Sequence, residues 1–481
     1  MNGEGNKLSK LKRKLGFWHA YATATGLVVA GSTLVTLGTS MGLTGSAFIV
    51  STLIALVISI IIALSYAELS SILPGAGMIG DYTSVAMGKF MAIVSVLCGY
   101  FVLVATVGAA ETMTAGSAVQ SLFPNVNVTL IMVLLLSFFL VVNLLGVEIF
   151  GFIQVILTLI MMITLSVMGI LGLFGILTVT SAKPVAFNPA GWGTVFQSIS
   201  LSLWLFIGIE FVLPLAEEVK NPNKTIPKAM IIGLISIFIA DMLFGQAIVH
   251  YIDLGTLSSS ATPHIDGVAA MFGGTGKTLM VIITIFAAAS SINSNFAVVP
   301  RMFYGLARDG LLPKIFAYLH PTFRTPWTAI IFVYLLFCVP LFLLKSTGEI
   351  LSILILSACT TWILSYIIAQ VNVLILRRKY PEIDRPFKAP FTPYLQIAGI
   401  LSCVYMIATI HPDPVLKRQI YAIAGGFTVS ICLYAFIWLK MKKIPLFQPV
   451  PLDIKKSEII AESEEITDCD LEIDFGEEMR K

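Results

Sequence analysis

Two long apolar segments of this chain are interrupted by glycine and polar residues. The first interruption lies between Gly26 and Thr33, and the second lies between Trp204 and Glu210. An unpaired backbone group in hydrocarbon costs several kcal/mol, so unwound backbone at membrane depth persists only beside a cavity or a ligand. Paired interruptions in the two halves of a membrane chain indicate a binding site for a small molecule. Either interruption alone would equally well mark a close contact between two helices.

Four acidic residues lie within the apolar stretches: Glu68, Glu111, Glu210 and Asp241. An ionisable group there costs at least ~2.5–3.5 kcal/mol, so each is a functional candidate. Glu111 has small neighbours that allow a close approach to a cavity or a second helix, and Glu210 directly follows the second interruption. Glu68 lies near the end of its segment, where we expect a structural hydrogen-bonding role. The sequence assigns no role to Asp241.

The composition requires a membrane as the setting of these residues. The chain has 481 residues, of which 57% are hydrophobic and 12% are charged, and its mean hydropathy is +0.92. A net charge of +3 gives no indication of a nucleic-acid partner. The six cysteines form no CxxC pair, and the five histidines show no metal-ligand spacing. With no nucleophile–base pair or carboxylate dyad either, we expect no catalytic residues, no metal and no cofactor, and hence no enzyme.

The apolar segments predict an all-α polytopic membrane protein with about twelve transmembrane helices. The predicted spans are 17–41, 46–73, 90–119, 127–146, 149–178, 195–217, 227–251, 277–306, 326–344, 349–377, 394–411 and 417–440. With the N-terminus placed in the cytoplasm, only five of the thirty Lys and Arg residues fall in outer loops, namely Lys183, Lys277, Lys345, Lys417 and Arg418. This asymmetry predicts that both termini are cytoplasmic in a multi-pass protein of the plasma membrane.

This pattern predicts that the chain is divided into three parts. Residues 1–15 form a basic cytoplasmic N-terminus, residues 16–440 form the transmembrane domain, and residues 441–481 form a cytoplasmic tail. Within the tail, residues 457–479 carry ten acidic side chains and no Lys or Arg. Such runs are normally solvated, and a regulatory role is the alternative.

Several motifs, each weak alone, occur together and resemble those of the amino acid–polyamine–organocation (APC) permeases over roughly residues 15–440. They are the Gly31-Ser32-Thr33 break, Tyr66-Ala67-Glu68-Leu69 with Pro74-Gly75-Ala76-Gly77, Phe206-Ile207-Gly208-Ile209-Glu210, Ala216-Glu217-Glu218-Val219-Lys220-Asn221-Pro222, Ile226-Pro227, and the run from Arg301 to Pro313. The resemblance implies a LeuT-type fold with a 5+5 inverted repeat, in which residues 16–178 and 195–377 are the repeats and residues 394–440 supply helices 11 and 12. Helices 1 and 6 would be unwound around the substrate, and helices 3, 8 and 10 would line it.

The resemblance also implies the site residues. Those expected to bind substrate are Val29, Gly31, Ser32, Thr33, Gly108, Glu111, Trp204, Phe206, Ile207 and Gly208. Those expected to couple or gate are Glu210, Trp204, Ser290 and Ser291. The resemblance places Glu111 on the substrate-facing side of helix 3, and Trp204 or Phe206 would act as an aromatic lid over a cation.

The coupling ion is the least determined feature. Some proton-coupled APC permeases carry a lysine in helix 5, and the position that corresponds to it here is Met161. Lysine-based proton coupling is therefore not expected. Glu210 is a candidate carrier of a coupling proton, and Ser290, Ser291 and Ser294 are candidate sodium ligands. Uncoupled uniport or exchange of one amine for another remains the rival, with Glu210 purely structural.

These observations together predict a secondary active transporter, a permease or an antiporter, that moves amino acids or small amines by alternating access. The intramembrane Glu111 favours a cationic substrate such as a basic amino acid, a polyamine or a small amine such as ethanolamine. The expected partners are this amine-bearing substrate, the lipid bilayer and a coupling proton. The alternative is a substrate-gated membrane sensor of the same fold without significant flux. A channel is disfavoured because no span shows a continuous polar face.

Overall fold

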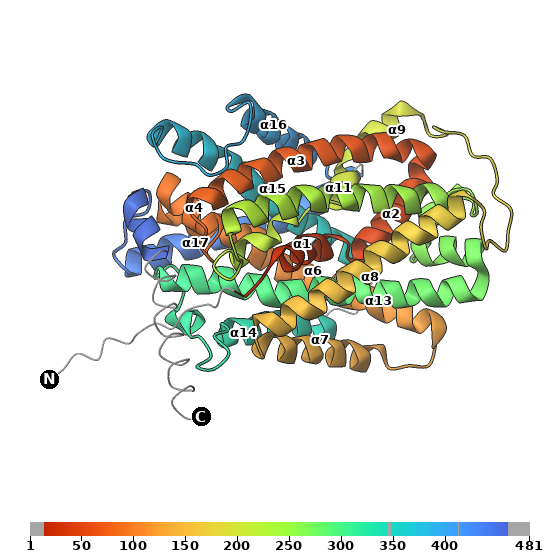
Figure 1. The fold of residues 1–481 in the computed structure, drawn as a ribbon, viewed down its shortest axis with the longest axis horizontal. Coiled ribbons are helices and arrows are strands. Elements are labelled where there is room, and N and C mark those ends of the chain that lie inside the picture. Colours follow the sequence, from red (N-terminus) through yellow and green to blue (C-terminus); the bar gives the residue numbers. More distant parts are fainter. Residues whose placement is uncertain (1–13, 344–347, 412, 460–481) are drawn as a thin grey trace, which may run out of the picture.

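The computed structural model describes residues 14–343, 348–411 and 413–459. These residues form helices connected by turns and loops, and the part of the chain that is described contains no β-strand beyond one parallel bridge between Leu15 and Val219. The long helices run side by side along one axis of the molecule (Figure 1). The predicted all-α fold is therefore confirmed.

The first half of the chain contains eight α-helices and two tighter or wider turns. They are α1 (Phe17–Val28), α2 (Gly31–Thr44), η1 (Gly45–Ala47), α3 (Phe48–Ile72), α4 (Ile79–Ala86), α5 (Lys89–Val96), the π-turn η2 (Leu97–Phe101), α6 (Val102–Leu122), α7 (Val128–Leu144) and α8 (Val147–Leu173).

The described residues of the second half contain nine α-helices and two 3-10 helices. Its elements are α9 (Gly191–Gln197), α10 (Ile199–Trp204), the 3-10 helix η3 (Ile209–Leu215), α11 (Pro222–Ile248), α12 (Leu254–Ser259), α13 (Pro263–Arg308), η4 (Lys314–Ala317), α14 (Trp327–Leu343), α15 (Gly348–Lys379), α16 (Tyr394–Ala408) and α17 (Pro414–Met441). Residues 452–459 add a final helical segment.

Eight helical stretches in the described chain are long and apolar enough to cross a membrane, and three shorter apolar helices accompany them. Each of the twelve predicted spans overlaps one or more of the helices above. The protein is thus an integral membrane protein, while the count of twelve crossings and the inverted repeat stay predictions. Most of the predicted acidic run of the tail, from residue 460 onward, lies outside the described residues.

The helices that carry the interruptions lie at the centre of the bundle. The helix α1 packs against α8, α11 and α13, and α2 packs against α6, α12 and α13. Small residues allow these contacts: a Cβ atom at Gly38 of α2 would lie 2.7 Å from Pro263 Cβ in α13. At the second interruption, the segment Ile209–Leu215 packs against α1, α11 and α13, so both interruptions lie in the protein interior, away from lipid.

Candidate functional site

The first interruption is a two-residue break between α1 and α2. Val29 (φ −81°, ψ 70°) and Ala30 (φ −91°, ψ 170°) leave the helical conformation, and α2 begins at Gly31. The break lies within the predicted interval from Gly26 to Thr33, and Gly31, Ser32 and Thr33 form the first turn of α2 directly after it. Thr33 donates its hydroxyl to the carbonyl oxygen of Ala30 at 2.7 Å, which closes the first turn of α2.

A carboxylate from another helix caps this first turn. Glu111 of α6 is only 2% exposed, and its Oε2 accepts the backbone N–H of Gly31 at 3.0 Å. The first N–H groups of a helix have no partner within the helix, and the helix dipole places partial positive charge on them. Glu111 therefore sits where an anion is stabilised. The glycine allows this approach, because a Cβ atom at Gly31 would lie 2.9 Å from Thr114 Cγ2.

The second interruption is a four-residue turn between α10 and η3. The helix α10 ends at Trp204, and Gly208 adopts a left-handed conformation with φ 105° before η3 begins at Ile209. The backbone N–H of Gly208 donates to the hydroxyl oxygen of Tyr366 in α15 at 3.1 Å. Only glycine adopts this conformation at little cost, so its presence at this position has a direct structural reason.

Glu210, the first acid after this turn, is fully enclosed. Its carboxylate accepts the Trp362 indole N–H at 2.8 Å, the Tyr366 hydroxyl at 2.8 Å and the Tyr100 hydroxyl at 3.1 Å. The side chain is 0% exposed. Glu210 thus joins the turn after α10 to η2 and α15 through three neutral donors.

Two cavities meet at the interruptions. A small cavity of about 30 Å³ is lined by Leu27, Val28, Ala30, Ser32, Thr33, Leu103, Val107, Glu111, Trp204, Ile207, Ser291, Asn295 and Trp362. A larger cavity of about 800 Å³, which we call the vestibule, lies beside it. Ser32, Trp204 and Ile207 line both cavities. The partly buried Trp204 therefore stands at the junction between them.

The structure brings six of the predicted site residues to the small cavity: Ser32, Thr33, Glu111, Trp204, Ile207 and Ser291. Seven others do not line it: Val29, Gly31, Gly108, Phe206, Gly208, Glu210 and Ser290. Gly108 serves helix packing instead, because a Cβ atom there would lie 2.6 Å from the ring of Phe337. Phe206 is 1% exposed and belongs to the core, so Trp204 is the aromatic residue placed to act as a lid.

Sequence reasoning missed two lining residues from the second half of the chain. Asn295 of α13 is 5% exposed, and its Oδ1 has no hydrogen-bond partner among the described residues. Trp362 of α15 forms a second aromatic wall. Both lie in helices expected to line the site. The amide of Asn295 in span 8 and the indole of Trp362 in span 10 are the sequence signals that could have identified them.

The face of α8 that meets α1 carries neutral polar groups. Gln154 Nε2 donates to the carbonyl oxygen of Ala22 at 3.3 Å and to Ser290 Oγ at 2.7 Å. Ser290 in turn donates to the carbonyl oxygen of Gly26 at 2.8 Å. Met161, on the same helix, is fully buried in the apolar core. Of the three serines expected to ligate sodium, Ser290 is thus bonded to Gln154 and Gly26, whereas the buried Ser294 hydroxyl has no hydrogen-bond partner among the described residues.

Ion pairs close one end of the molecule, which we call the ion-paired end. Arg301 of α13, 1% exposed, donates to both carboxylate oxygens of Glu218, one of them at 2.9 Å. The Leu15 N–H donates to the Glu218 carbonyl oxygen at 2.9 Å, and the Lys220 N–H donates to the Leu15 carbonyl oxygen at 2.8 Å. Burial raises the pKa of the Glu218 carboxyl, and Arg301 opposes that shift. The start of α1, the segment after η3 and the end of α13 are therefore tied together.

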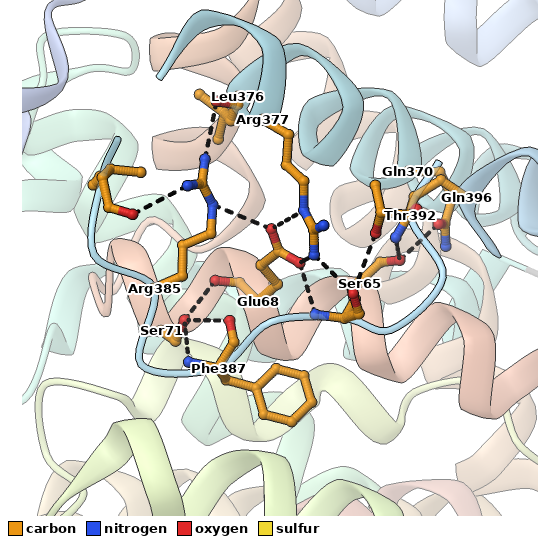
Figure 2. A network of polar contacts seen from close by, with 12 residues as sticks. Ser65, Glu68, Ser71, Gln370, Leu376, Arg377, Arg385, Phe387, Thr392 and Gln396 are labelled. Carbon is orange, nitrogen blue, oxygen red and sulfur yellow. Dashed lines mark hydrogen bonds and ion pairs between the residues drawn. The ribbon is translucent and has the colours of Figure 1, made fainter. Parts of the chain in front are cut away.

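A second ion-pair cluster at this end contains Glu68, which Figure 2 shows between two arginines. Glu68 accepts two hydrogen bonds from Arg377, at 2.7 and 2.8 Å, and lies 3.4 Å from Arg385. Its Oε2 also accepts the Ala389 N–H at 2.8 Å. The expected structural role of Glu68 is confirmed by these contacts.

The chain beyond α17 reaches a third cluster. Lys455 lies 3.0 Å from Asp81 of α4 and also pairs with Asp309. Burial lowers the pKa of Lys455, but the two carboxylates raise it more, so the ammonium stays charged. Asp241, the remaining intramembrane acid, is 3% exposed, has no hydrogen bond or ion pair among the described residues and lines neither cavity.

Comparison with known proteins gives concordant matches. The family model described as amino acid permease matches residues 15–437. The branched-chain amino acid permease BcaP of Bacillus subtilis is 24% identical over 86% of this chain and 92% of its own. The methylthioribose transporter of the same organism is 24% identical over 89% of this chain and 95% of its own. The solved structure of Mhp1, a nucleobase-cation-symport-1 family transporter, is 12% identical with a TM-score of 0.53, covering 95% of this chain and 99% of that one, which shows a similar fold.

Proposed function

The chain belongs to the amino acid permease family, and from this membership we propose that it is a secondary transporter of an amine-bearing metabolite, with the cationic group held at Glu111. Members of this family are transporters and not enzymes. The observation that carries the proposal is the position of Glu111: its buried carboxylate lines the small cavity at the break between α1 and α2. No Lys, Arg or His is among the described residues that line this cavity.

The arrangement of closed and open ends supports alternating access. The vestibule leads to the small cavity past Trp204, while Arg301 and Glu218 close the ion-paired end. Because the basic loops predict that the ion-paired end faces the cytoplasm, the arrangement corresponds to a state open to the outside of the plasma membrane. Transport would then require the Leu15–Glu218 backbone pairing and the Arg301–Glu218 ion pair to separate.

Uptake of labelled amino acids and amines into proteoliposomes, combined with a thermal-shift screen of the purified protein, tests the proposal. Glu111→Gln should weaken binding of the cationic substrate by about 30-fold or more, because removing one partner of a buried charge pair costs ~2–5 kcal/mol. The matched control is Glu148→Gln, whose side chain is 65% exposed at the start of α8.

The binding and uptake measurements distinguish the proposed transporter from its alternatives. Unchanged affinity in Glu111→Gln would show that this carboxylate does not hold the substrate. Ligand binding to the wild type without any uptake would instead favour a substrate-gated sensor on the same fold. Uptake that survives in Glu148→Gln and is lost in Glu111→Gln is the expected outcome.

A further inference from the structure

The first backbone donor that a substrate carboxylate would use, the Gly31 N–H, is already occupied. The start of a helix binds anions because its first N–H groups are unpaired and carry partial positive charge. In this chain the Gly31 N–H at the start of α2 donates to Glu111 Oε2 at 3.0 Å, and both groups are buried. The protein therefore supplies its own carboxylate at the position where the α-carboxylate of an amino acid would be stabilised.

The rest of the small cavity offers acceptors. Asn295 lines the cavity and is 5% exposed. Its amide nitrogen donates to the Ser291 carbonyl oxygen at 3.0 Å, while its Oδ1 has no hydrogen-bond partner among the described residues. The helix α1 ends at Val28 and directs the negative end of its dipole towards the same break. Together with Glu111, these groups suit an ammonium ion, and the Ser32 hydroxyl is a lining group without a hydrogen-bond partner among the described residues.

The size of the two cavities separates the head of a ligand from its body. The small cavity of about 30 Å³ is far smaller than the vestibule, so it suits a small head group such as an ammonium. The remainder of a bound molecule must extend past Trp204 into the vestibule of about 800 Å³.

The vestibule is uncharged. Its described lining contains hydroxyl, amide, indole, thiol, thioether and hydrocarbon side chains, and no Asp, Glu, Lys or Arg. A second ammonium group on the ligand would therefore find no counter-charge in the vestibule. An aliphatic or aromatic body would instead contact side chains such as Met113, Met132 and Leu201.

We propose that the substrate is a monoamine without a carboxylate, whose ammonium lies between Glu111 and Asn295 and whose uncharged body occupies the vestibule. This inference rests on the proposed transport function and narrows its substrate class. An α-amino acid would place its carboxylate beside Glu111, where like charges repel and the Gly31 N–H is already taken. Diamines, polyamines and basic amino acids would place an unpaired charge in the vestibule.

Two matched pairs of compounds test the inference on the full chain in proteoliposomes. Isoamylamine and leucine have the same side chain and differ in the α-carboxylate, while butylamine and putrescine differ in the second amine. We expect uptake of isoamylamine and butylamine, and apparent affinities for leucine and putrescine that are weaker by at least about tenfold, since like-charge juxtaposition or an unpaired charge exceeds the cost of one decade in affinity.

A change of preference in one variant gives the sharpest test. Glu111→Ala frees the Gly31 N–H and should increase leucine affinity while reducing isoamylamine affinity, a reversal that a merely structural role of Glu111 would not produce. If this variant does not fold, Glu111→Gln keeps an acceptor for Gly31 and should lose isoamylamine binding without gaining leucine binding.

The outcomes are distinguishable. Wild-type affinity for leucine equal to that for isoamylamine, or for putrescine equal to that for butylamine, would overturn the monoamine inference and leave the transport function intact. Uptake of none of the four compounds would overturn both. Failure of both Glu111 variants to alter the ratio of isoamylamine to leucine would also contradict the inference.

Discussion

The two interruptions of this bundle hold a glutamate in opposite ways. At the first, Glu111 accepts the backbone N–H of Gly31, lies beside Ser32 and lines a cavity. At the second, Glu210 accepts three hydrogen bonds and lines neither cavity. The same residue type, equally buried, is available to a ligand in one place and committed to neighbouring side chains in the other. Proximity to an unwound turn therefore does not identify a binding residue; a position on the wall of a cavity does.

We expect the largest difference between the two interruptions in the stability lost when the enclosed carboxylate of Glu210 is removed. Glu210→Leu leaves the Trp362 indole N–H and the hydroxyls of Tyr100 and Tyr366 without their acceptor. Each unsatisfied buried donor costs about 1–3 kcal/mol, so we expect a loss of roughly 3 kcal/mol or more in stability. Thermal unfolding in detergent measures it.

The comparison with Glu111 makes this result informative. Glu111→Gln retains an oxygen that can accept the Gly31 N–H, so its unfolding temperature should stay near that of the wild type. A Glu210→Leu variant as stable as wild type would contradict the structural role assigned to the second glutamate.

The glycines of the two breaks should separate stability from binding. Gly208 has φ 105°, so Gly208→Ala should cost about 1–3 kcal/mol of stability through backbone strain. Gly31 lies in the first turn of α2 without a positive φ, and its added methyl group would meet Thr114 Cγ2 at 2.9 Å and Glu111 Oε2 at 3.4 Å. Gly31→Ala should therefore weaken substrate binding with little change in unfolding temperature. Equal loss of stability in both variants would remove the distinction.

The aromatic residues flanking the second break provide a smaller contrast. Trp204 lines both cavities, so Trp204→Leu should reduce substrate affinity by about 10- to 30-fold, the equivalent of a desolvated cation–π contact worth ~2 kcal/mol. Phe206 is 1% exposed and packs in the core, so Phe206→Leu should instead cost about 2 kcal/mol of stability at ~0.8 kcal/mol per buried carbon group. A binding isotherm and a melting curve for each variant check the pair, and a stability loss in Trp204→Leu would assign that side chain to packing.

Much of this architecture was predictable from local patterns. The all-α fold, both interruptions and the structural role of Glu68 follow from hydropathy, glycine placement and position along a span. The exact limits of the first break were not, because Gly31 is helical and is needed for the approach of Thr114 and Glu111 rather than for unwinding.

The hydrogen-bond partners of Glu111 and Glu210 could not be predicted from the sequence either. The Glu111–Gly31 contact joins positions 80 residues apart, and the Trp362–Glu210 contact joins positions 152 residues apart. Asn295 shows the same limit: an amide in an apolar span is visible in the sequence, but whether its oxygen is satisfied depends on which side chains the packed helices bring to it.

The smallest effect should be the response to ion gradients. Glu210 accepts hydrogen bonds from three neutral donors of the protein, and Gln154 and Ser290 donate to the carbonyl oxygens of Ala22 and Gly26. These contacts lead us to expect uniport or exchange, with sodium held at the unpartnered Ser294 hydroxyl as the rival. Uptake into proteoliposomes should be the same with and without an imposed pH or sodium gradient, once the charge carried by the substrate is balanced with a potassium diffusion potential. Uptake by the Glu210→Gln variant should likewise be the same with and without these gradients, even if the substitution changes the rate of transport. A pH gradient that drives uptake in the wild type and not in Glu210→Gln would restore Glu210 as a proton carrier, and the second interruption would then be a functional site on a par with the first.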